Sequence, residues 1–278
     1  MISKFFGLSG SIHVSLPAEE LFRIGPLKFT NSMVLGTIAY VLLIWMFWYV
    51  ARKLKSGHNN RFVTGVHWMF EGLLKTIEQA VGDKEKARKI APLSITIFFF
   101  VVVNYWIGVL PIVGPIEYHG VPLFRGPATD LNVTFALAII TMVAVQVFAI
   151  MTHGFFGNAK RYFISPLKDP AHSFEGILEL VAEFSRLMAL SLRLFGNVFA
   201  GEILVAVIAF LSGWVTPISQ PFFLAFELFI GIVQAYVFFM LSVVFISLGS
   251  SVHSEHKETH DVPVADKPVG MDSEAVKA

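Results

Sequence analysis

Arg193 is a cation in the middle of a long apolar stretch of the chain. Within ten residues on either side of it, the only other charged residues are Glu183, Arg186 and Glu202. Placing a charged side chain at the centre of a bilayer costs roughly 2.5–3.5 kcal/mol on insertion scales, and such residues usually mark the path of an ion or substrate. We therefore expect Arg193 to act on an ion, or on an anionic group, inside a membrane.

Other polar residues share one face of the same predicted helix. At 100° per residue, Arg186, Arg193 and Asn197 fall within about 40° of one another. Glu179 lies on the same stripe. The spacing predicts one polar face along a helix that is otherwise apolar.

Two further carboxylates occupy different faces. Glu202 lies about 180° around the helix from Arg193. On the last apolar segment, Glu227 and Gln234 are seven residues apart and share a face. Antiparallel packing of the two helices predicts that Glu202 and Glu227 reach the same depth and form a carboxylate-lined pocket.

Each of these residues also has a purely structural interpretation. Glu183 and Arg186 could form an intrahelical pair at i, i+3. Gln234 could tie two helices together, and Arg193 could be the counter-ion of a buried carboxylate of its own chain. Asn132, a secondary channel candidate, stands near the start of an apolar span, where polar residues commonly begin helices, and Asp130 is a plausible N-cap.

The histidines do not predict a metal centre. His153 and His172 lie at span ends, where surface histidines are common. His253, His256 and His260 have a spacing that metal ligands can show, but they stand in a polar tail. We expect no metal ion and no cofactor.

The composition is that of a membrane protein with several helical spans. Of 278 residues, 55% are hydrophobic and 15% are charged, whereas soluble domains carry about 25% charged residues. The absence of cysteine excludes disulfides and thiolate chemistry. A net charge of +1 argues against a nucleic-acid partner.

Apolar runs, turns and charge clusters divide the chain into seven segments, and we expect an all-α membrane protein of about five crossing helices plus one amphipathic surface helix. The segments are an N-terminal outer-side segment (1–32), a first transmembrane helix (33–51), a cytoplasmic amphipathic segment (52–91), a transmembrane hairpin in which Pro92 starts the second span (92–153), a cytoplasmic loop (154–172), a hairpin of two long, steeply tilted helices (173–252) and a flexible cytoplasmic tail (253–278).

The basic residues predict the orientation. They concentrate in segment 52–91 and in the loop that follows the third span, whereas the loop at 114–130 holds only Arg125. Basic loops face the cytoplasm. The N-terminus should therefore lie outside and the C-terminus inside, and the lack of an Arg- and Ser-rich leader favours a bacterial inner membrane.

The run SLRLFGNVFAGE, from Ser191 to Glu202, closely resembles the signature of subunit a of F-type ATP synthases. LFRIGPLKFTNSM before the first span, DLNVT at the start of the third, and FELFIGIVQAYVFFMLSVVFIS near the end resemble the same family in the same order. Together these stretches cover most of residues 20–250.

The resemblance implies a role for several residues. Arg193 matches the arginine that faces the carboxylate of each passing c subunit, with Asn197 and Gln234 as polar residues near it. Glu202 and Glu227 match the outer half-channel, although some members have His at the second position. Glu179 and Arg186 match charged positions on the cytoplasmic side. Ala189 stands where some relatives have Ser.

The implied protein is a non-catalytic stator subunit that translocates an ion, expected to be the proton. Its implied partners are the c-ring, the peripheral-stalk b subunits and membrane lipid. The alternative that the residues leave open is a secondary transporter or channel with a buried arginine site, which an inverted repeat would favour. No such repeat is visible in the sequence.

Overall fold

A computed structural model describes residues 20–24, 27–57, 60–110, 117–118, 121–162 and 170–251 of the chain. The histidines of the tail lie outside these residues, as do most of the N-terminal segment and the tail itself. Within the described residues the chain is almost entirely helical. The helices are α2 (Asn31–Lys55), α3 (Arg61–Val81), α4 (Lys84–Val109), η1 (Pro127–Thr129), α5 (Leu131–His153), α6 (Phe155–Tyr162), α7 (Pro170–Ser212), η2 (Gly213–Val215) and α8 (Thr216–Ser251).

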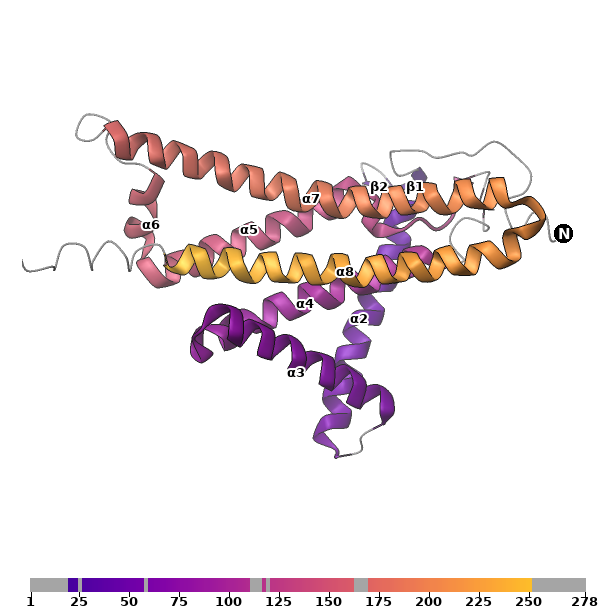
Figure 1. Cartoon of the computed structure of the whole chain (residues 1–278), viewed down its shortest axis with the longest axis horizontal. Coiled ribbons are helices and arrows are strands. Elements are labelled where there is room, and N and C mark those ends of the chain that lie inside the picture. Colours follow the sequence, from indigo (N-terminus) through magenta and orange to yellow (C-terminus); the bar gives the residue numbers. More distant parts are fainter. Residues whose placement is uncertain are drawn as a thin grey trace, which may run out of the picture.

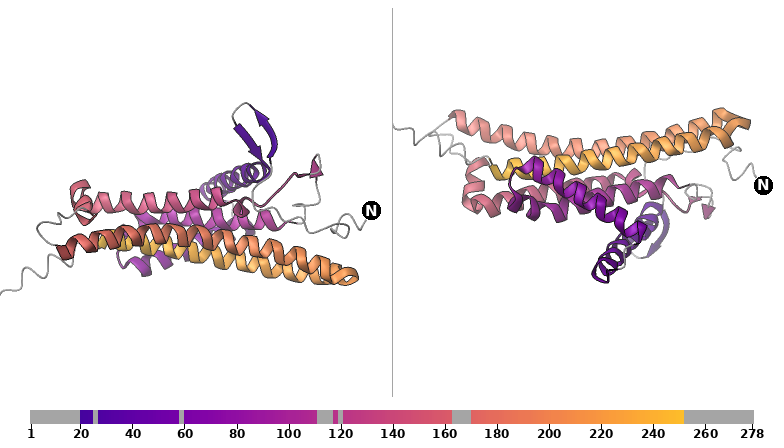
Figure 2. Two further views of the ribbon diagram at one scale, coloured as in Figure 1. Left: turned by 90° about the horizontal axis from the view of Figure 1, so that it is seen from above. Right: turned by 60° about the horizontal axis from the view of Figure 1, so that its bottom comes forward.

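Two short antiparallel hairpins accompany the helices. One pairs β1 (Glu20–Ile24) with β2 (Leu27–Thr30), and the other pairs β3 (Glu117–Tyr118) with β4 (Val121–Pro122). The first hairpin stands beside the start of α2, away from the long helices (Figure 2). Neither hairpin changes the fold class.

Within the part of the chain that the structure describes, four stretches are long and apolar enough to cross a membrane: Asn31–Lys55, Lys84–Val109, Leu131–His153 and Gly176–Gly249. The last spans most of α7 and of α8, which turn back on each other at η2 and run side by side (Figure 1). The expected all-α membrane fold is confirmed.

The helices α7 and α8 form the long axis of the molecule. α8 packs against α4, α5 and α7, whereas α2 crosses the direction of α8 steeply (Figure 1). A helix longer than the bilayer is thick must tilt to remain within it. The steep angle between α2 and the α7–α8 hairpin agrees with the expected tilt of that hairpin.

The core lies between α4 and α8. Phe98 of α4 meets Phe239 of α8 edge-to-face, with ring centroids 6.1 Å apart. Tyr105 of α4 lies so close to Gly231 of α8 that a Cβ at position 231 would stand 2.6 Å from its ring. Small residues at a helix interface let backbones and aromatic rings approach closely. Gly231 therefore permits the contact between α4 and α8.

The amphipathic helix is α3. The side chain of Asn60 caps its first turn, and Gly82 ends it in the left-handed conformation, with φ of 75°. Its buried face consists of Val63, Leu73 and Ile77, while Trp68 is exposed. A helix with one buried apolar face and further exposed aromatic residues suits a membrane interface.

Two boundaries differ from the sequence expectation. Helix α4 begins at Lys84 rather than Pro92, because Asp83 caps it and buried Ala87, Ile90 and Ala91 hold its first turns against the bundle despite the missing N–H of Pro92. The stretch expected as a loop after the third span contains α6, which Asn158 links to Gln146 of α5 through a 2.9 Å hydrogen bond.

Candidate functional site

Arg193 lies on the exposed side of α7. The opposite side of that helix is buried, with Leu190, Leu194 and Val198 between 2% and 4% exposed. Buried Ser191 lies 3.2 Å from the hydroxyl of Thr134 on α5. The Arg193 side chain itself is exposed. It forms no hydrogen bond or ion pair with any residue that the structure describes.

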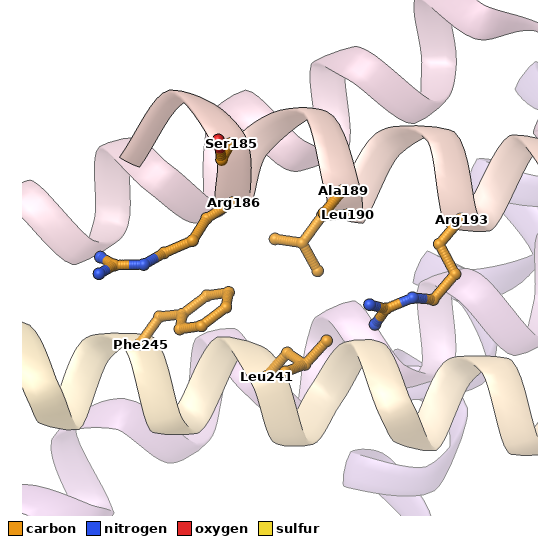
Figure 3. A pocket seen from close by; sticks show the side chains of 7 residues that line it. All are labelled: Ser185, Arg186, Ala189, Leu190, Arg193, Leu241 and Phe245. Atoms are coloured by element: carbon orange, nitrogen blue, oxygen red, sulfur yellow. The ribbon is translucent and has the colours of Figure 1, made fainter. Parts of the chain in front are cut away.

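An open groove of about 230 Å³ runs between α7 and α8 beside Arg193. Its α7 side holds two arginines, Arg186 and Arg193, separated by Ala189 and Leu190, and its α8 side is apolar, formed by Leu241 and Phe245 (Figure 3). Both guanidinium groups extend from α7 towards α8 in this view. The groove therefore connects the two cations along the predicted polar face.

At the far end of the groove, Arg186 pairs with Glu179, with its guanidinium nitrogen 3.4 Å from the carboxylate oxygen. The guanidinium also lies over the ring of Phe245, 5.5 Å from the centroid. The alternative pairing of Glu183 with Arg186 is wrong. Instead, Glu183 accepts a hydrogen bond of 2.7 Å from Gln146 of α5.

Asn197 and Gln234 are brought together from α7 and α8. The Asn197 amide nitrogen donates to the Gln234 side-chain oxygen at 2.6 Å. Gln234 is buried, and its own amide nitrogen has no hydrogen-bond partner among the described residues. The interpretation of Gln234 as a side chain that links two helices is therefore confirmed. Its amide nitrogen stays available as a hydrogen-bond donor.

Glu227 is the buried carboxylate of the pair that the antiparallel packing predicted. Its side chain is 5% exposed and lies directly against Gly201, where any Cβ would overlap the carboxylate. Glu202, the next residue of α7, is exposed. The contact of Glu227 with Gly201 agrees with the expected common depth of Glu202 and Glu227, and the carboxylate-lined pocket stays a prediction.

Asn132 does not join the other candidates. Its backbone and side-chain nitrogens both donate to Asp130, at 2.9 and 3.0 Å. The Asp130 carboxylate also accepts a hydrogen bond of 2.8 Å from the hydroxyl of Ser32 on α2. Asp130 is the N-cap of α5, as predicted. Asn132 lies in the first turn of that helix, in agreement with its structural interpretation.

Sequence reasoning missed Arg125. This residue comes from the loop before η1, yet it is 5% exposed, and its Nε donates a 3.1 Å hydrogen bond to the Thr129 hydroxyl. A single arginine in a Pro- and Gly-rich loop looks like a surface residue, and nothing in the local pattern indicates burial.

Among the described residues no group of three or more His, Asp or Glu side chains could hold a metal ion. The Nδ1 of His153 lies 3.2 Å from the carbonyl oxygen of Ala149, inside its own helix. The side chain of His172 lies outside the residues that the structure describes.

The model of the family described as ATP synthase A chain matches residues 33–247. The chain belongs to the ATP synthase subunit a family. Subunit a of Mycobacterium bovis is 32% identical over 232 residues, which cover 82% of this chain and 89% of that protein. Subunit a of Shewanella halifaxensis is 32% identical, covering 81% and 82%. Subunit a of Enterococcus faecalis is 29% identical, covering 82% and 95%.

Membership of the subunit a family places the chain in the membrane sector of ATP synthase, Fo, and in ion translocation. Its apolar helices agree with a membrane-embedded protein. α7 and α8 bring together two cations along one groove and a hydrogen-bonded amide pair, and they place the buried carboxylate of Glu227 against Gly201.

Proposed function

We propose that this chain is the stator of a rotary motor, in which Arg193 faces the carboxylates of a rotating c-ring and two half-channels carry ions to and from them. The observation that carries this proposal is the exposed position of Arg193 on an apolar helix, without a partner in the described part of its own chain. An intramembrane cation without an internal partner needs an anionic partner from another chain.

Arg193 acts as a fixed charge. A rotor carboxylate that faces lipid must be neutral, through a proton or a bound cation, because an exposed charge in hydrocarbon is prohibitive. An arginine remains protonated under all relevant conditions. Opposite Arg193 the rotor carboxylate is stabilised in its ionised form and releases its ion. The same charge opposes a direct leak of cations between the two half-channels.

Glu202 and Glu227 form the outer half-channel in this proposal. They come together from α7 and α8, and Glu227 is the deeper of the two side chains. Along α7, Asn197 lies between Arg193 and Glu202. Its hydrogen-bond partner on α8, Gln234, lies between Glu227 and Leu241, which lines the groove beside Arg193. Polar side chains in this order offer successive positions for a proton or for a hydrated ion.

The inner half-channel follows the groove from Arg193 to the pair of Arg186 and Glu179. The groove is open and has an apolar α8 wall, so an ion leaving the rotor meets no competing carboxylate until it reaches Glu179. Residue 189 is Ala in this chain. No hydroxyl is needed at that position for the path that we propose.

The placement in the membrane follows the positive-inside rule. The N-terminus lies outside, and the C-terminus lies in the cytoplasm of a bacterial cell. Five crossings, with α7 and α8 as separate spans, satisfy this orientation. α3 then lies at the cytoplasmic interface, where lipid and the peripheral-stalk b subunits can contact its exposed side.

In this proposal the c-ring sets the number of ions that pass for each ATP. One elementary charge that moves through 100 mV yields about 2.3 kcal/mol, so several ions must pass for each ATP. A ring of several carboxylates that passes a single Arg193 supplies this ratio. The chain itself breaks and forms no covalent bond, and we propose that it is non-catalytic.

The test is ATP-driven proton pumping by the assembled complex in membrane vesicles carrying Arg193→Ala. We expect pumping to fall to background while the complex assembles and its soluble headpiece still hydrolyses ATP. Arg61→Ala, which removes an exposed arginine from α3, is the matched control and should pump like wild type. Undiminished pumping by Arg193→Ala would remove the basis of the proposal. Uptake of a small anion by the purified chain alone would favour the transporter alternative.

A further inference from the structure

Tyr105 of α4 carries a buried hydroxyl that the proposed path does not use. The residue is 1% exposed, and its hydroxyl has no hydrogen-bond partner in the described part of the chain. A buried polar group without a partner is costly. A phenylalanine would fill the space of this ring without that cost, and Phe98, Phe99 and Phe100 stand shortly before it on the same helix. The hydroxyl itself therefore needs an explanation.

The ring of Tyr105 lies against α8 at Gly231. A Cβ at position 231 would stand 2.6 Å from the ring. The neighbouring residue, Trp106, donates from its indole nitrogen to the carbonyl oxygen of Leu228 at 3.3 Å. Two adjacent residues of α4 thus contact one turn of α8, and this turn begins directly after Glu227.

Gly231 lies between two polar residues on one face of α8. Glu227 precedes it by four residues and Gln234 follows it by three, and residues at these spacings lie above one another on a helix. At 1.5 Å per residue, their backbones stand about 6 Å and about 4.5 Å from that of Gly231 along the helix axis. Tyr105, which covers Gly231, is therefore placed between Glu227 and Gln234 along α8.

Gln234 contributes an unpartnered group of its own. Its side-chain oxygen accepts from Asn197 of α7 at 2.6 Å, which leaves its amide nitrogen to donate elsewhere. That nitrogen is buried and has no hydrogen-bond partner among the described residues. Buried polar groups that lack a protein partner are usually satisfied by water. The hydroxyl of Tyr105 and the amide of Gln234 thus indicate a small hydrated site between α4 and α8.

The same interface becomes apolar two turns away. There Phe98 of α4 meets Phe239 of α8 edge-to-face, with ring centroids 6.1 Å apart, and both rings are buried. Such rings offer water no hydrogen-bond partner. The hydrated site that we infer therefore belongs to the part of the interface beside Glu227.

We propose that Tyr105 is a further residue of the outer half-channel, where its hydroxyl relays protons between Glu227 and Gln234. This inference rests on the proposed half-channel. A hydroxyl both accepts and donates hydrogen bonds. A proton that leaves the Glu227 carboxyl passes through water to a lone pair of the tyrosine oxygen, while the proton of the tyrosine moves to water held by the Gln234 amide nitrogen. One O–H bond forms and one breaks at that oxygen, so its charge does not change.

The first variant to measure is Tyr105→Phe, which deletes the hydroxyl and keeps the ring over Gly231. We expect ATP-driven proton pumping by the assembled complex in vesicles to fall about fivefold, within the range for loss of one hydrogen bond. The thermal midpoint of the complex should not fall, because the hydroxyl bonds to no described residue. Tyr40→Phe is the matched control. Tyr40 of α2 stacks on Phe100, with ring centroids 5.3 Å apart, outside the proposed path, and its variant should pump like wild type.

A second measurement asks whether water reaches position 105. The chain contains no cysteine, so Tyr105→Cys and Phe98→Cys each introduce a single thiol on α4, in place of aromatic side chains that are 1% and 4% exposed. The assembled complexes are treated with a small cationic methanethiosulfonate reagent, and modification of this chain is followed by mass spectrometry. We expect the thiol at 105 to react at least about tenfold faster, because thiols in apolar surroundings are inert.

Wild-type pumping by Tyr105→Phe would overturn the inference. A loss of pumping with an equally clear fall in thermal midpoint, or failure of Tyr105→Phe to assemble, would overturn it as well, because the hydroxyl would then serve folding. Equally slow reaction of the two thiols would show that water does not reach the site. If either cysteine variant does not assemble, Tyr105→Phe decides alone.

Glu227→Gln separates this inference from the proposal on which it rests. Wild-type pumping by Glu227→Gln would contradict the outer half-channel itself. Loss of pumping by Glu227→Gln together with wild-type pumping by Tyr105→Phe would leave the half-channel in place and contradict only the role of Tyr105.

Discussion

The side chain of Asn197 on α7 donates a 2.6 Å hydrogen bond to that of Gln234 on α8. This bond joins the two helices one turn beyond Arg193, where the predicted polar face of α7 meets the face of α8 that carries Glu227. It therefore fixes how the two halves of the proposed path are aligned. Its contribution to function can be separated from its contribution to stability.

Gln234→Leu should lower the rate of ion pumping much more than the stability of the complex. Hydrogen bonds between helices in membranes contribute about 0.6 kcal/mol on average, so the thermal midpoint of the complex should move little. Pumping should fall severalfold, because both polar groups of Gln234 are lost from the path. A large drop in thermal midpoint with normal pumping would show that Gln234 only holds the helices together.

Gly201→Val should impair pumping because its side chain displaces the Glu227 carboxylate. Any Cβ at position 201 overlaps that carboxylate, and overpacking of this kind typically costs about 1–3 kcal/mol. Gly72→Ala on α3 is the control, since a Cβ there meets nothing within 4 Å. Pumping by Gly201→Val that equals the Gly72→Ala control would mean that the position of Glu227 is unimportant.

Gly231→Ala should destabilise the contact between α4 and α8. The added methyl would press on the ring of Tyr105, with an expected loss of about 1–3 kcal/mol in the free energy of unfolding. In a Tyr105→Ala chain, the further loss caused by Gly231→Ala should be smaller, because a smaller side chain at 105 leaves room for the added methyl. Thermal unfolding of the purified complex measures both, and strictly additive losses would contradict the packing that we describe.

Exchange of the charges in the Arg186 and Glu179 pair should preserve stability. The two side chains are 28% and 25% exposed, and partly exposed pairs contribute about 0.2–1 kcal/mol. Glu179→Arg/Arg186→Glu should unfold near the wild-type temperature but should pump more slowly, because the order of charges along the groove is reversed. A pumping rate equal to that of wild type would show that Glu179 and Arg186 are not part of the inner half-channel.

Much of this architecture could be predicted from the amino-acid pattern. Arg193, far from other charges in an apolar run, predicted the centre of the candidate site because a charge in such a place is costly. The seven-residue spacing of Glu227 and Gln234 predicted a common face, and the chain does present both to α7. The cap at Asp130 followed from its position before an apolar span.

Other features depend on contacts between distant segments and leave no local signal. Arg125 stands in a loop of turn-forming residues, and its burial results from four helices that enclose η1. Arg186 could pair at helical spacing with Glu183 or with Glu179. In the structure Arg186 pairs with Glu179, and Glu183 accepts a hydrogen bond from Gln146 on another helix. Pro92 suggested a helix start, but the packing of Ala87, Ile90 and Ala91 carries the helix through it.

The most direct test of the central claim asks whether the Arg193 face of α7 touches the rotor. The chain contains no cysteine, so Ala189→Cys introduces a single thiol about one turn before Arg193 on an exposed face. A second cysteine is placed in the c subunit beside its carboxylate. We expect oxidation to form a disulfide between the two chains, which requires Cα atoms within about 7 Å. Met151→Cys, on an exposed part of α5, should form none. An assembled complex in which Ala189→Cys also forms no disulfide with the c subunit would contradict the rotor-facing role of Arg193.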